Sequence, residues 1–256
     1  RRTGYFEDVV VETPAVPGST DLVDVNFMVV ERPSGNLMLG AGFSQSAGMI
    51  LNTQVSQDNF MGSGKSINFA FNNSEINKTF KLGYFNPYWS IDGVARGFDI
   101  SYSEIDSGRR QIARYDQENI STGVSFGLPL TEFNYLNLGL NWERTKIGTS
   151  EFLLDPVIAR FLFFEGREYD NFRLQSSFSY DTRNAGIFPD RGTLQRISAE
   201  IAMPGGDLYY YKLDYDSRYY FKLPFRRNYT LLLKGKVGYG DSYGSTFELP
   251  FFRNFF

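Results

Sequence analysis

The sequence predicts an all-β protein whose main part is a transmembrane antiparallel β-barrel, and three observations lead to this prediction. Apolar and polar residues alternate with a period of two in many segments; in residues 65–72, for example, Ile67, Phe69 and Phe71 alternate with small or polar residues. Most segments approach the roughly 9–11 residues that a tilted strand needs to cross a bilayer. The connections are of two kinds, short turns and long loops, as in outer-membrane barrels.

The composition of the 256-residue chain narrows the function classes. Its 26 basic and 29 acidic residues nearly balance, so the charge predicts no nucleic-acid partner. The absence of cysteine and histidine excludes disulfides, Ser-His-Asp triads and histidine-ligated metal sites within this sequence. We therefore expect no catalytic residue, no metal site, no cofactor and no enzyme activity. The chain opens with Arg1-Arg2-Thr3-Gly4 and no methionine, so we expect an excised or processed piece.

The first 33 residues differ from the rest of the chain. Residues 9–13 and 24–31 are predicted strands, and a turn rich in proline and glycine at 14–20 joins them. Two strands are marginal in water by themselves, so residues 1–33 are interpreted as the tail of a small α+β domain. The barrel is expected to occupy residues 34–256.

From residue 36 onward the alternation predicts eleven successive strands, each with one apolar face and one polar or small face. They cover residues 36–44, 49–56, 65–72, 79–84, 94–102, 120–128, 136–143, 172–181, 196–203, 209–222 and 231–239. Aromatic residues gather near strand ends on the apolar face, as in the girdles that contact a membrane interface: Phe43, Tyr84, Tyr102, Trp142, Tyr180, Phe221 and Tyr239.

A large soluble β-protein is the alternative to the barrel. Its charged face would simply be solvated, so charge alone leaves both architectures open. Strand length and the connections favour the barrel. In a barrel, Phe69 faces lipid and Asn68 faces a wet interior.

The predicted connections differ in length. Short ones cover 59–64, 86–93, 129–134, 204–207 and 224–228, and longer ones cover 103–116, 146–170 and 181–192. We expect the short, proline-containing turns on one rim and the long loops on the other. The longest loop contains a predicted short helix at 155–162, with Asp155 as N-cap and Pro156 at the first helical position. This helix is interpreted as a lid over the barrel rim.

Several short strings carry a family resemblance. They are Tyr5-Phe6-Glu7, Val16-Pro17-Gly18-Ser19, QDNFMGSG at 57–64, Asn86-Pro87-Tyr88-Trp89, Phe188-Pro189-Asp190-Arg191-Gly192, Pro204-Gly205-Gly206-Asp207, Gly238-Tyr239-Gly240-Asp241 and Pro250-Phe251-Phe252-Arg253-Asn254-Phe255-Phe256. In this order the sequence resembles the BamA family of POTRA-barrel insertases. The resemblance implies that residues 1–33 end the last periplasmic POTRA domain. It also implies that residues 34–256 are the N-terminal part of an outer-membrane barrel, about eleven of sixteen strands.

The resemblance further implies a functional site in the first barrel strand. In the family this strand pairs weakly with the last strand and forms a lateral gate, where it would capture a client strand by β-augmentation. An open edge in lipid must satisfy its main-chain groups, and glycine weakens a strand. The implied client-binding residues are Asn36, Leu37, Met38, Leu39, Gly40, Ala41, Gly42 and Phe43. The alternative for these glycines is that they relieve crowding where the barrel bends.

The implied function is that of a core component of the machinery that folds and inserts β-barrel proteins into the bacterial outer membrane. The implied partners are unfolded client outer-membrane proteins, accessory lipoproteins of the BamB, BamC, BamD and BamE type, and outer-membrane lipid and lipopolysaccharide. The alternative function is a two-partner-secretion-type POTRA-barrel transporter that exports a soluble client through its pore. Four charged residues form a predicted lumen network that braces an inward-folded loop or simply belongs to a hydrated wall: Lys212, Asp214, Asp216 and Arg218.

Overall fold

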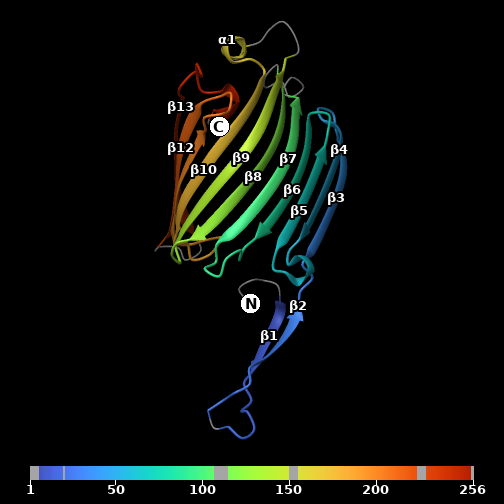
Figure 1. Cartoon of the computed structure of the whole chain (residues 1–256), viewed down its shortest axis with the longest axis vertical. Coiled ribbons are helices and arrows are strands. Elements are labelled where there is room, and N and C mark those ends of the chain that lie inside the picture. The colour runs from blue at the N-terminus through green and yellow to red at the C-terminus, as the bar shows by residue number, and fades with distance from the viewer. Residues whose placement is uncertain (1–5, 20, 107–114, 150–154, 224–228, 255–256) are drawn as a thin grey trace.

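The main body of the protein is one antiparallel sheet of eleven strands, in which each strand pairs with its neighbours in the sequence (Figure 1). The computed structural model describes residues 6–19, 21–106, 115–149, 155–223 and 229–254. The strands are β3 (Gly35–Ser44), β4 (Gly48–Gln57), β5 (Ser66–Asn73), β6 (Asn77–Asn86), β7 (Ala95–Asp106), β8 (Asp116–Pro129), β9 (Asn134–Gly148), β10 (Glu168–Asp181), β11 (Gly192–Ala202), β12 (Tyr210–Lys222) and β13 (Thr230–Ser242). All eleven predicted strands are confirmed.

The strand register turns the alternation of the sequence into two distinct sheet faces. One row of directly paired residues crosses eight strands as Leu37, Val55, Phe69, Leu82, Ile100, Thr122, Trp142 and Phe172. The adjacent row, on the opposite face, reads Met38, Gln54, Ala70, Lys81, Ser101, Ser121, Glu143 and Asn171. We call these the outer face and the inner face.

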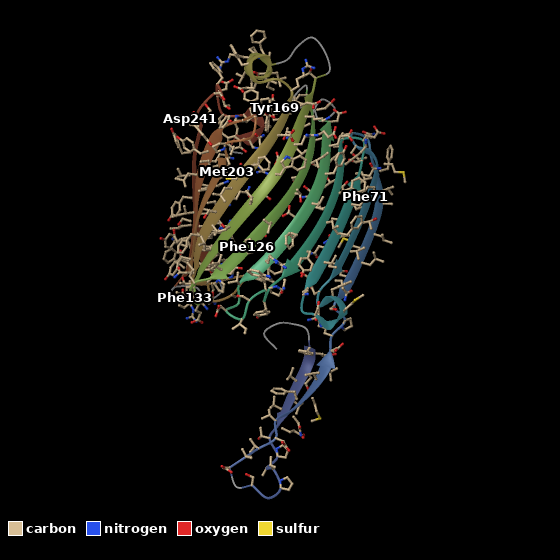
Figure 2. All side chains as sticks on the ribbon, viewed as in Figure 1. Phe71, Phe126, Phe133, Tyr169, Met203 and Asp241 are labelled. Atoms are coloured by element: carbon tan, nitrogen blue, oxygen red, sulfur yellow. The ribbon has the colours of Figure 1, made fainter. Side chains whose placement is uncertain are left out.

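Side chains stand on both faces of the sheet (Figure 2). Large apolar side chains of the outer face stay exposed, with Leu82 at 50% and Ile100 at 57%. Such a face contacts lipid rather than a protein core. Phe69 therefore lies on the lipid-facing side, and Asn68, on the same strand, lies on the polar side.

A separate two-stranded sheet precedes the large one. β1 (Phe6–Glu12) pairs antiparallel with β2 (Asn26–Glu31), with Phe27 opposite Val11. This hairpin projects beyond the rim at which β3 begins (Figure 1). Its apolar side chains are largely exposed, so the described part of residues 1–33 contains no core of its own. The assignment of residues 1–33 to a POTRA domain stays a prediction.

The prediction that short turns occupy one rim and long loops the other is wrong. The β3–β4, β5–β6, β7–β8, β9–β10 and β11–β12 connections share one rim, because antiparallel neighbours alternate in direction. The remaining connections share the other rim, next to β1 and β2. The predicted short turn at 204–207 therefore lies with the longest loop, and the longer connection at 181–192 lies with the predicted short turns. We call these rims the α1 rim and the hairpin rim. Residues 107–114 and 150–154 of the predicted long connections, together with residues 224–228 and 255–256, lie outside the described residues.

The predicted helix is confirmed as α1 (Pro156–Glu165), in the connection between β9 and β10. The Asp155 Oδ1 atom accepts a hydrogen bond from the Val157 N–H at 2.8 Å, and Pro156 occupies the first helical position. α1 lies at the rim to which it gives its name (Figure 1). None of the helices in the described ranges has the length and hydropathy needed to cross a bilayer.

Replacing Asp155 by alanine is expected to fray the first turn of α1, because the Val157 N–H loses its acceptor. The expected loss is about 1 kcal/mol of local helix stability, or about fivefold faster amide exchange in that turn. Hydrogen exchange measures it. Asp155→Asn keeps a capping oxygen and is the matched control. Equal exchange in the wild-type protein and the alanine variant would contradict the capping role.

Candidate functional site

β3 is an edge strand of the large sheet. In the part of the chain that the structure describes, it pairs with β4 alone, in an uninterrupted register from Gly35–Gln57 to Ser44–Gly48. All the residues predicted to bind a client strand, 36–43, lie in this strand. Its outer-face side chains are open, with Leu39 exposed to 69% and Phe43 to 81%.

The main-chain groups at the open edge of β3 can be assigned to individual residues. The Asp58 N–H donates to the Ser34 carbonyl at 2.9 Å, so these residues form a hydrogen-bonded pair just before the ladder. Hydrogen-bonded and non-hydrogen-bonded pairs alternate along an antiparallel ladder. Even-numbered residues of β3 therefore direct their N–H and C=O groups toward β4. The odd-numbered residues direct theirs to the open edge: Leu37, Leu39, Ala41 and Phe43.

Two glycines of β3, Gly40 and Gly42, are not required by crowding among the described residues. Neither Gly40 nor Gly42 has a positive φ. A Cβ atom added at Gly42 would meet no heavy atom within 4 Å, and one at Gly40 would meet the Asn52 Cβ at an ordinary 3.7 Å. Alanine would fit at both positions. At these two positions glycine gives the strand more backbone freedom than alanine would. A role in a pliable edge stays a prediction.

The predicted charge network lies on the inner face of β12. The Arg218 Nε atom contacts the Asp216 Oδ1 atom at 2.9 Å, and Asp214 pairs with Lys236 of β13 at 3.8 Å. Lys212 lies opposite Glu200 of β11 in the register. These groups keep part of their surface in solvent, as in a hydrated lumen wall. A role in bracing a loop stays a prediction.

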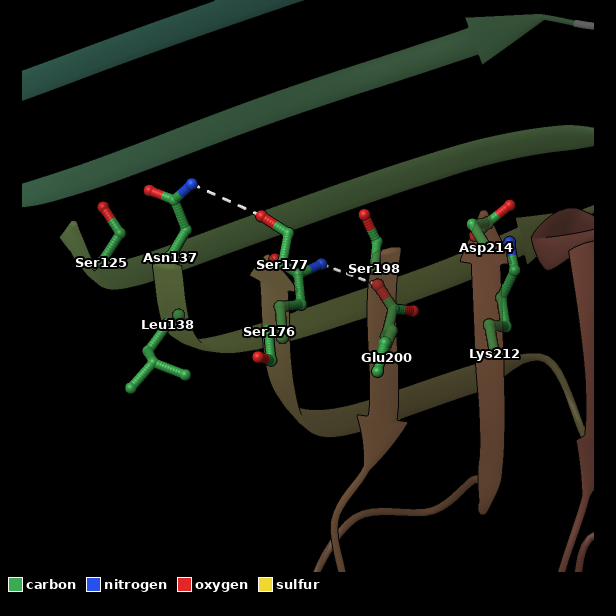
Figure 3. A pocket seen from close by; sticks show the side chains of 12 residues that line it. Ser125, Asn137, Leu138, Ser176, Ser177, Ser198, Glu200, Lys212 and Asp214 are labelled. Atoms are coloured by element: carbon green, nitrogen blue, oxygen red, sulfur yellow. Dashed lines mark hydrogen bonds between the residues drawn. The ribbon is translucent and has the colours of Figure 1, made fainter. Parts of the chain in front are cut away.

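A shallow cavity of about 300 Å³ crosses the inner face from β8 to β12 (Figure 3). The Asn137 amide donates to the Ser177 hydroxyl at 3.4 Å, and the Gln175 amide donates to Glu200 Oε2 at 2.7 Å. Lys212 and Asp214 border the same cavity (Figure 3). Most of the residues that line the cavity carry hydroxyl, amide or charged groups, although carbon atoms make up much of its surface.

The most deeply buried charges lie elsewhere on the inner face and were not predicted as a site. Arg173 of β10 lies between two carboxylates: its Nη2 contacts Glu143 of β9, and its Nη1 donates to Glu200 of β11 at 3.1 Å. Arg253 contacts the other oxygen of Glu143. Arg173 is 8% exposed and Glu143 is 5% exposed. We call Glu143, Arg173, Glu200 and Arg253 the buried charge quartet.

The charge of Arg253 depends on its neighbours. Burial lowers its pKa, but Tyr210, Glu143 and Glu200 outweigh this effect, so its pKa lies above the ordinary value. The guanidinium therefore stays charged in the interior of the protein. The Nε atoms of Arg173 and Arg253 are enclosed and have no hydrogen-bond partner among the described residues. The carboxylates of Glu143 and Glu200 therefore each provide a large share of the negative charge that balances the two arginines.

Helix α1 and η2 (Phe251–Arg253) cover the quartet at the α1 rim. Phe161 of α1 is fully buried, and its ring centroid lies 5.6 Å from that of Phe251 and 6.2 Å from that of Phe252. Arg160 of the same helix forms an ion pair with Glu248 at 2.5 Å. α1 therefore packs on the segment that carries Arg253, and both cover this part of the inner face. A gating role as a lid stays a prediction.

The sequence contained part of the signal for the quartet. Glu143, Arg173 and Glu200 all fall on the predicted polar faces of their strands. Opposite charges on polar faces of consecutive strands are therefore a signal that could have marked the site. The approach of Arg253 gave no comparable signal, because it is 110 residues from Glu143 in the chain and lies outside the sheet.

Comparisons with known proteins agree with this architecture. Residues 59–256 match the family model described as the Omp85 superfamily domain. The chain is 31% identical over 263 residues to the outer membrane protein assembly factor BamA of Neisseria meningitidis serogroup B, across 99% of this chain and 33% of that protein. It is 26% identical over 229 residues to the sorting and assembly machinery component 50 homolog of Xenopus tropicalis, across 84% of this chain and 45% of that protein.

A solved structure shows the same fold. The crystal structure of BamA from Haemophilus ducreyi lacking POTRA domains 1–3 superposes with a TM-score of 0.82 at 27% identity, over 99% of this chain and 50% of that chain. This chain thus spans between a third and a half of the length of these relatives. The family match covers most of the described sheet. The chain belongs to the Omp85 superfamily, and its eleven-stranded sheet is part of an outer-membrane β-barrel.

Proposed function

We propose that this protein folds client β-barrel proteins and inserts them into the outer membrane, as a core component of a β-barrel assembly machinery. The observation that carries the proposal is the main-chain geometry of β3, which, like β13, is an end strand of this part of the barrel: its odd-numbered residues direct their N–H and C=O groups away from β4. The names of the Neisseria and Xenopus relatives, an assembly factor and an assembly machinery component, support the same role.

The edge of β3 would act through its main chain. An unpaired N–H or C=O group in the hydrocarbon region costs roughly several kcal/mol, so the edge is stabilised when a client strand supplies the partners. Pairing through main-chain groups accepts clients of different sequence. A register slip of one residue would turn the apolar face of the client strand to the lumen and its polar face to the lipid. The polar inner row and the apolar outer row of the sheet therefore favour client registers that keep each face on its own side. This process needs no catalytic side chain, metal or cofactor, and we propose that the protein is not an enzyme.

The proposed partners follow from this role. Unfolded client outer-membrane proteins would meet the edge of β3. Accessory lipoproteins of the BamB, BamC, BamD and BamE type would engage the periplasmic part, of which residues 1–33 are proposed to be the end. Outer-membrane lipid and lipopolysaccharide would contact the outer face of the sheet.

Disulfide cross-linking tests the proposal, because the chain has no cysteine of its own. In an antiparallel pair with a client, the even-numbered residues of β3 would form the non-hydrogen-bonded pairs, with Cα atoms about 4.5 Å apart and side chains closest. Single cysteines at Met38 and Gly40 of the full-length protein are therefore expected to cross-link to a cysteine in the last strand of a stalled client. Moving the client cysteine by two residues is expected to exchange the preferred position.

Two sets of positions complete the design. Cysteines at Leu39 and Ala41, which would lie in hydrogen-bonded pairs with the client, are expected to cross-link less efficiently. Cysteines at Lys212 and Asp216 report on passage through the lumen. Strong client cross-links at these inner positions, with none at β3, would replace the insertase by the secretion transporter.

A further inference from the structure

Arg96 lies on the outer face of β7, close to the hairpin rim. In the register it is opposite Phe126 of β8, and Phe98 follows it on the same face of β7. Its guanidinium carbon lies 4.9 Å from the centroid of the Trp89 ring and 5.0 Å from that of Phe98. The Trp89 ring also lies 5.7 Å from that of Phe126. The guanidinium is therefore held in an aromatic cradle on the lipid-facing side of the sheet.

The position of Trp89 is fixed by the turn between β6 and β7. The Trp89 N–H donates to the Val94 carbonyl at 2.9 Å, and the Gly93 N–H donates to the Ser90 carbonyl at 3.1 Å. Gly93 has φ +80°, a conformation that favours glycine. The turn thus directs the tryptophan ring back over the strand that carries Arg96. The backbone hydrogen bonds of the turn fix the position of Trp89 in the cradle.

The charge of Arg96 has no protein counter-ion among the described residues, and its Nε atom is enclosed without a hydrogen-bond partner. Arg144, on the outer face near the opposite rim, gives the contrast. It also lies over a tryptophan, with its guanidinium carbon 5.7 Å from the Trp142 centroid. Arg144, however, donates to Asp170 from Nε at 2.9 Å and from Nη2 at 2.7 Å. One outward arginine is neutralised by the protein, whereas the other needs a partner from its surroundings.

We propose that Arg96 binds the phosphate of an anionic phospholipid in the membrane leaflet at the hairpin rim. Arginine and tryptophan are typical of the level where acyl chains meet headgroups, with the apolar stem and rings in the hydrocarbon and the charge toward water. A guanidinium offers paired donors that match phosphate geometry. Its interaction with aromatic rings strengthens when water is excluded. The cradle leaves the Nη groups as the donors for a lipid phosphate. The inference requires the outer face to contact lipid, but it does not require client insertion.

Tryptophan fluorescence tests this site, because the chain has two tryptophans, one at each rim. The full-length protein, with tryptophans outside this chain replaced by phenylalanine, is reconstituted with Trp142→Phe so that Trp89 alone reports. Two sets of vesicles are prepared. One contains phosphatidylglycerol that is brominated near the headgroup, and the other contains the same fraction of phosphatidylethanolamine that is brominated near the headgroup. We expect Trp89 to be quenched about two- to fivefold more strongly by the anionic lipid, because one basic side chain near an anionic membrane surface contributes up to about 1 kcal/mol. Arg96→Gln is expected to abolish this preference, and Arg96→Lys to retain part of it.

The Trp89→Phe variant is the matched control, because Trp142 lies beside the neutralised Arg144 and is expected to show no lipid preference. Equal quenching of Trp89 by both lipids, or a preference that survives Arg96→Gln, would overturn the proposal. Loss of the preference on adding millimolar inorganic phosphate would show a site for free phosphate and would also overturn the lipid assignment. Client assembly is measured separately, so its failure would refute the proposed function and leave this result standing.

Discussion

Removal of the Glu143 carboxylate, by Glu143→Ala, is expected to lower the free energy of unfolding by about 3–5 kcal/mol. Glu143 contacts both Arg173 and Arg253 and is almost fully buried. Arg173 keeps its hydrogen bond to Glu200, but Arg253 has no second ion pair among the residues that the structure describes. The substitution therefore leaves the Arg253 guanidinium in the interior without the one carboxylate that contacts it directly, and among the described carboxylates only the more distant Glu200 still favours its charge. The midpoint of denaturant-induced unfolding, measured on the full-length protein in lipid vesicles, gives the change.

The pair Asp214–Lys236 provides the matched control, because it also lies on the inner face but is wider, at 3.8 Å, and solvent-accessible. Asp214→Ala is expected to cost less than about 1 kcal/mol. Glu143→Gln keeps the volume and one acceptor oxygen, so its effect is expected to be intermediate. Equal effects of Glu143→Ala and Asp214→Ala would contradict a stabilising role for the buried charge quartet.

The geometry of the quartet shows why its pairing could not be predicted from the sequence, although the charged faces could. Glu143 lies directly opposite Asn171, and Arg173 lies opposite Asn141 and Ala202, so neither acidic residue faces Arg173 directly. The contacts are diagonal, two residues along the neighbouring strand, and the long arginine side chain spans that offset. Alternation identifies the face of each residue, but it does not fix the relative shift of the strands. That shift comes from the turns and from packing across the sheet.

The strands themselves could be predicted because two solvents act on the sheet. Lipid on one side and a hydrated lumen on the other require a period of two along every strand, and that period is visible in the sequence. The rims could not be sorted by connection length, because the position of a connection depends on how many strands precede it. The prediction missed the two tight turns between β3 and β4 and between β5 and β6, which share a rim with the longest loop.

At β3 the sequence identified the strand and its glycines, but the direction of each main-chain group needed the structure. The main-chain groups of the even-numbered residues of β3 face β4 and those of the odd-numbered residues face the open edge. This parity follows from one hydrogen bond, from the Asp58 N–H to the Ser34 carbonyl, and from a register without a bulge. A one-residue bulge in β3 would reverse this assignment for the residues of β3 beyond the bulge. With the parity known, a substitution can remove an edge donor while leaving the ladder to β4 in place.

Leu39→Pro is expected to slow client assembly about tenfold or more. Leu39 directs its N–H to the open edge, so proline removes a donor that a client strand would use. The proline ring would also occupy the space where the client strand pairs with β3. The loss of one main-chain hydrogen bond costs about 1 kcal/mol in water and roughly several kcal/mol in lipid, and about 1.4 kcal/mol corresponds to a factor of ten. The ladder to β4 is expected to stay intact, because edge strands tolerate proline where the N–H is not paired. The appearance of heat-resistant folded client in proteoliposomes measures the rate.

Two neighbouring substitutions separate the backbone from the side chain. Leu39→Ala keeps the edge N–H and is expected to assemble clients within about twofold of the wild-type rate, because β-augmentation depends on main-chain groups. Gly40→Pro removes an N–H that points to β4, so it is expected to weaken the sheet itself, visible as a lower unfolding midpoint that Leu39→Pro does not show. Equal slowing by Leu39→Ala and Leu39→Pro would assign recognition to the side chain. Wild-type assembly in Leu39→Pro would mean that clients do not add to this edge, and the open main-chain groups of β3 would then need another partner in the membrane, because lipid offers them none.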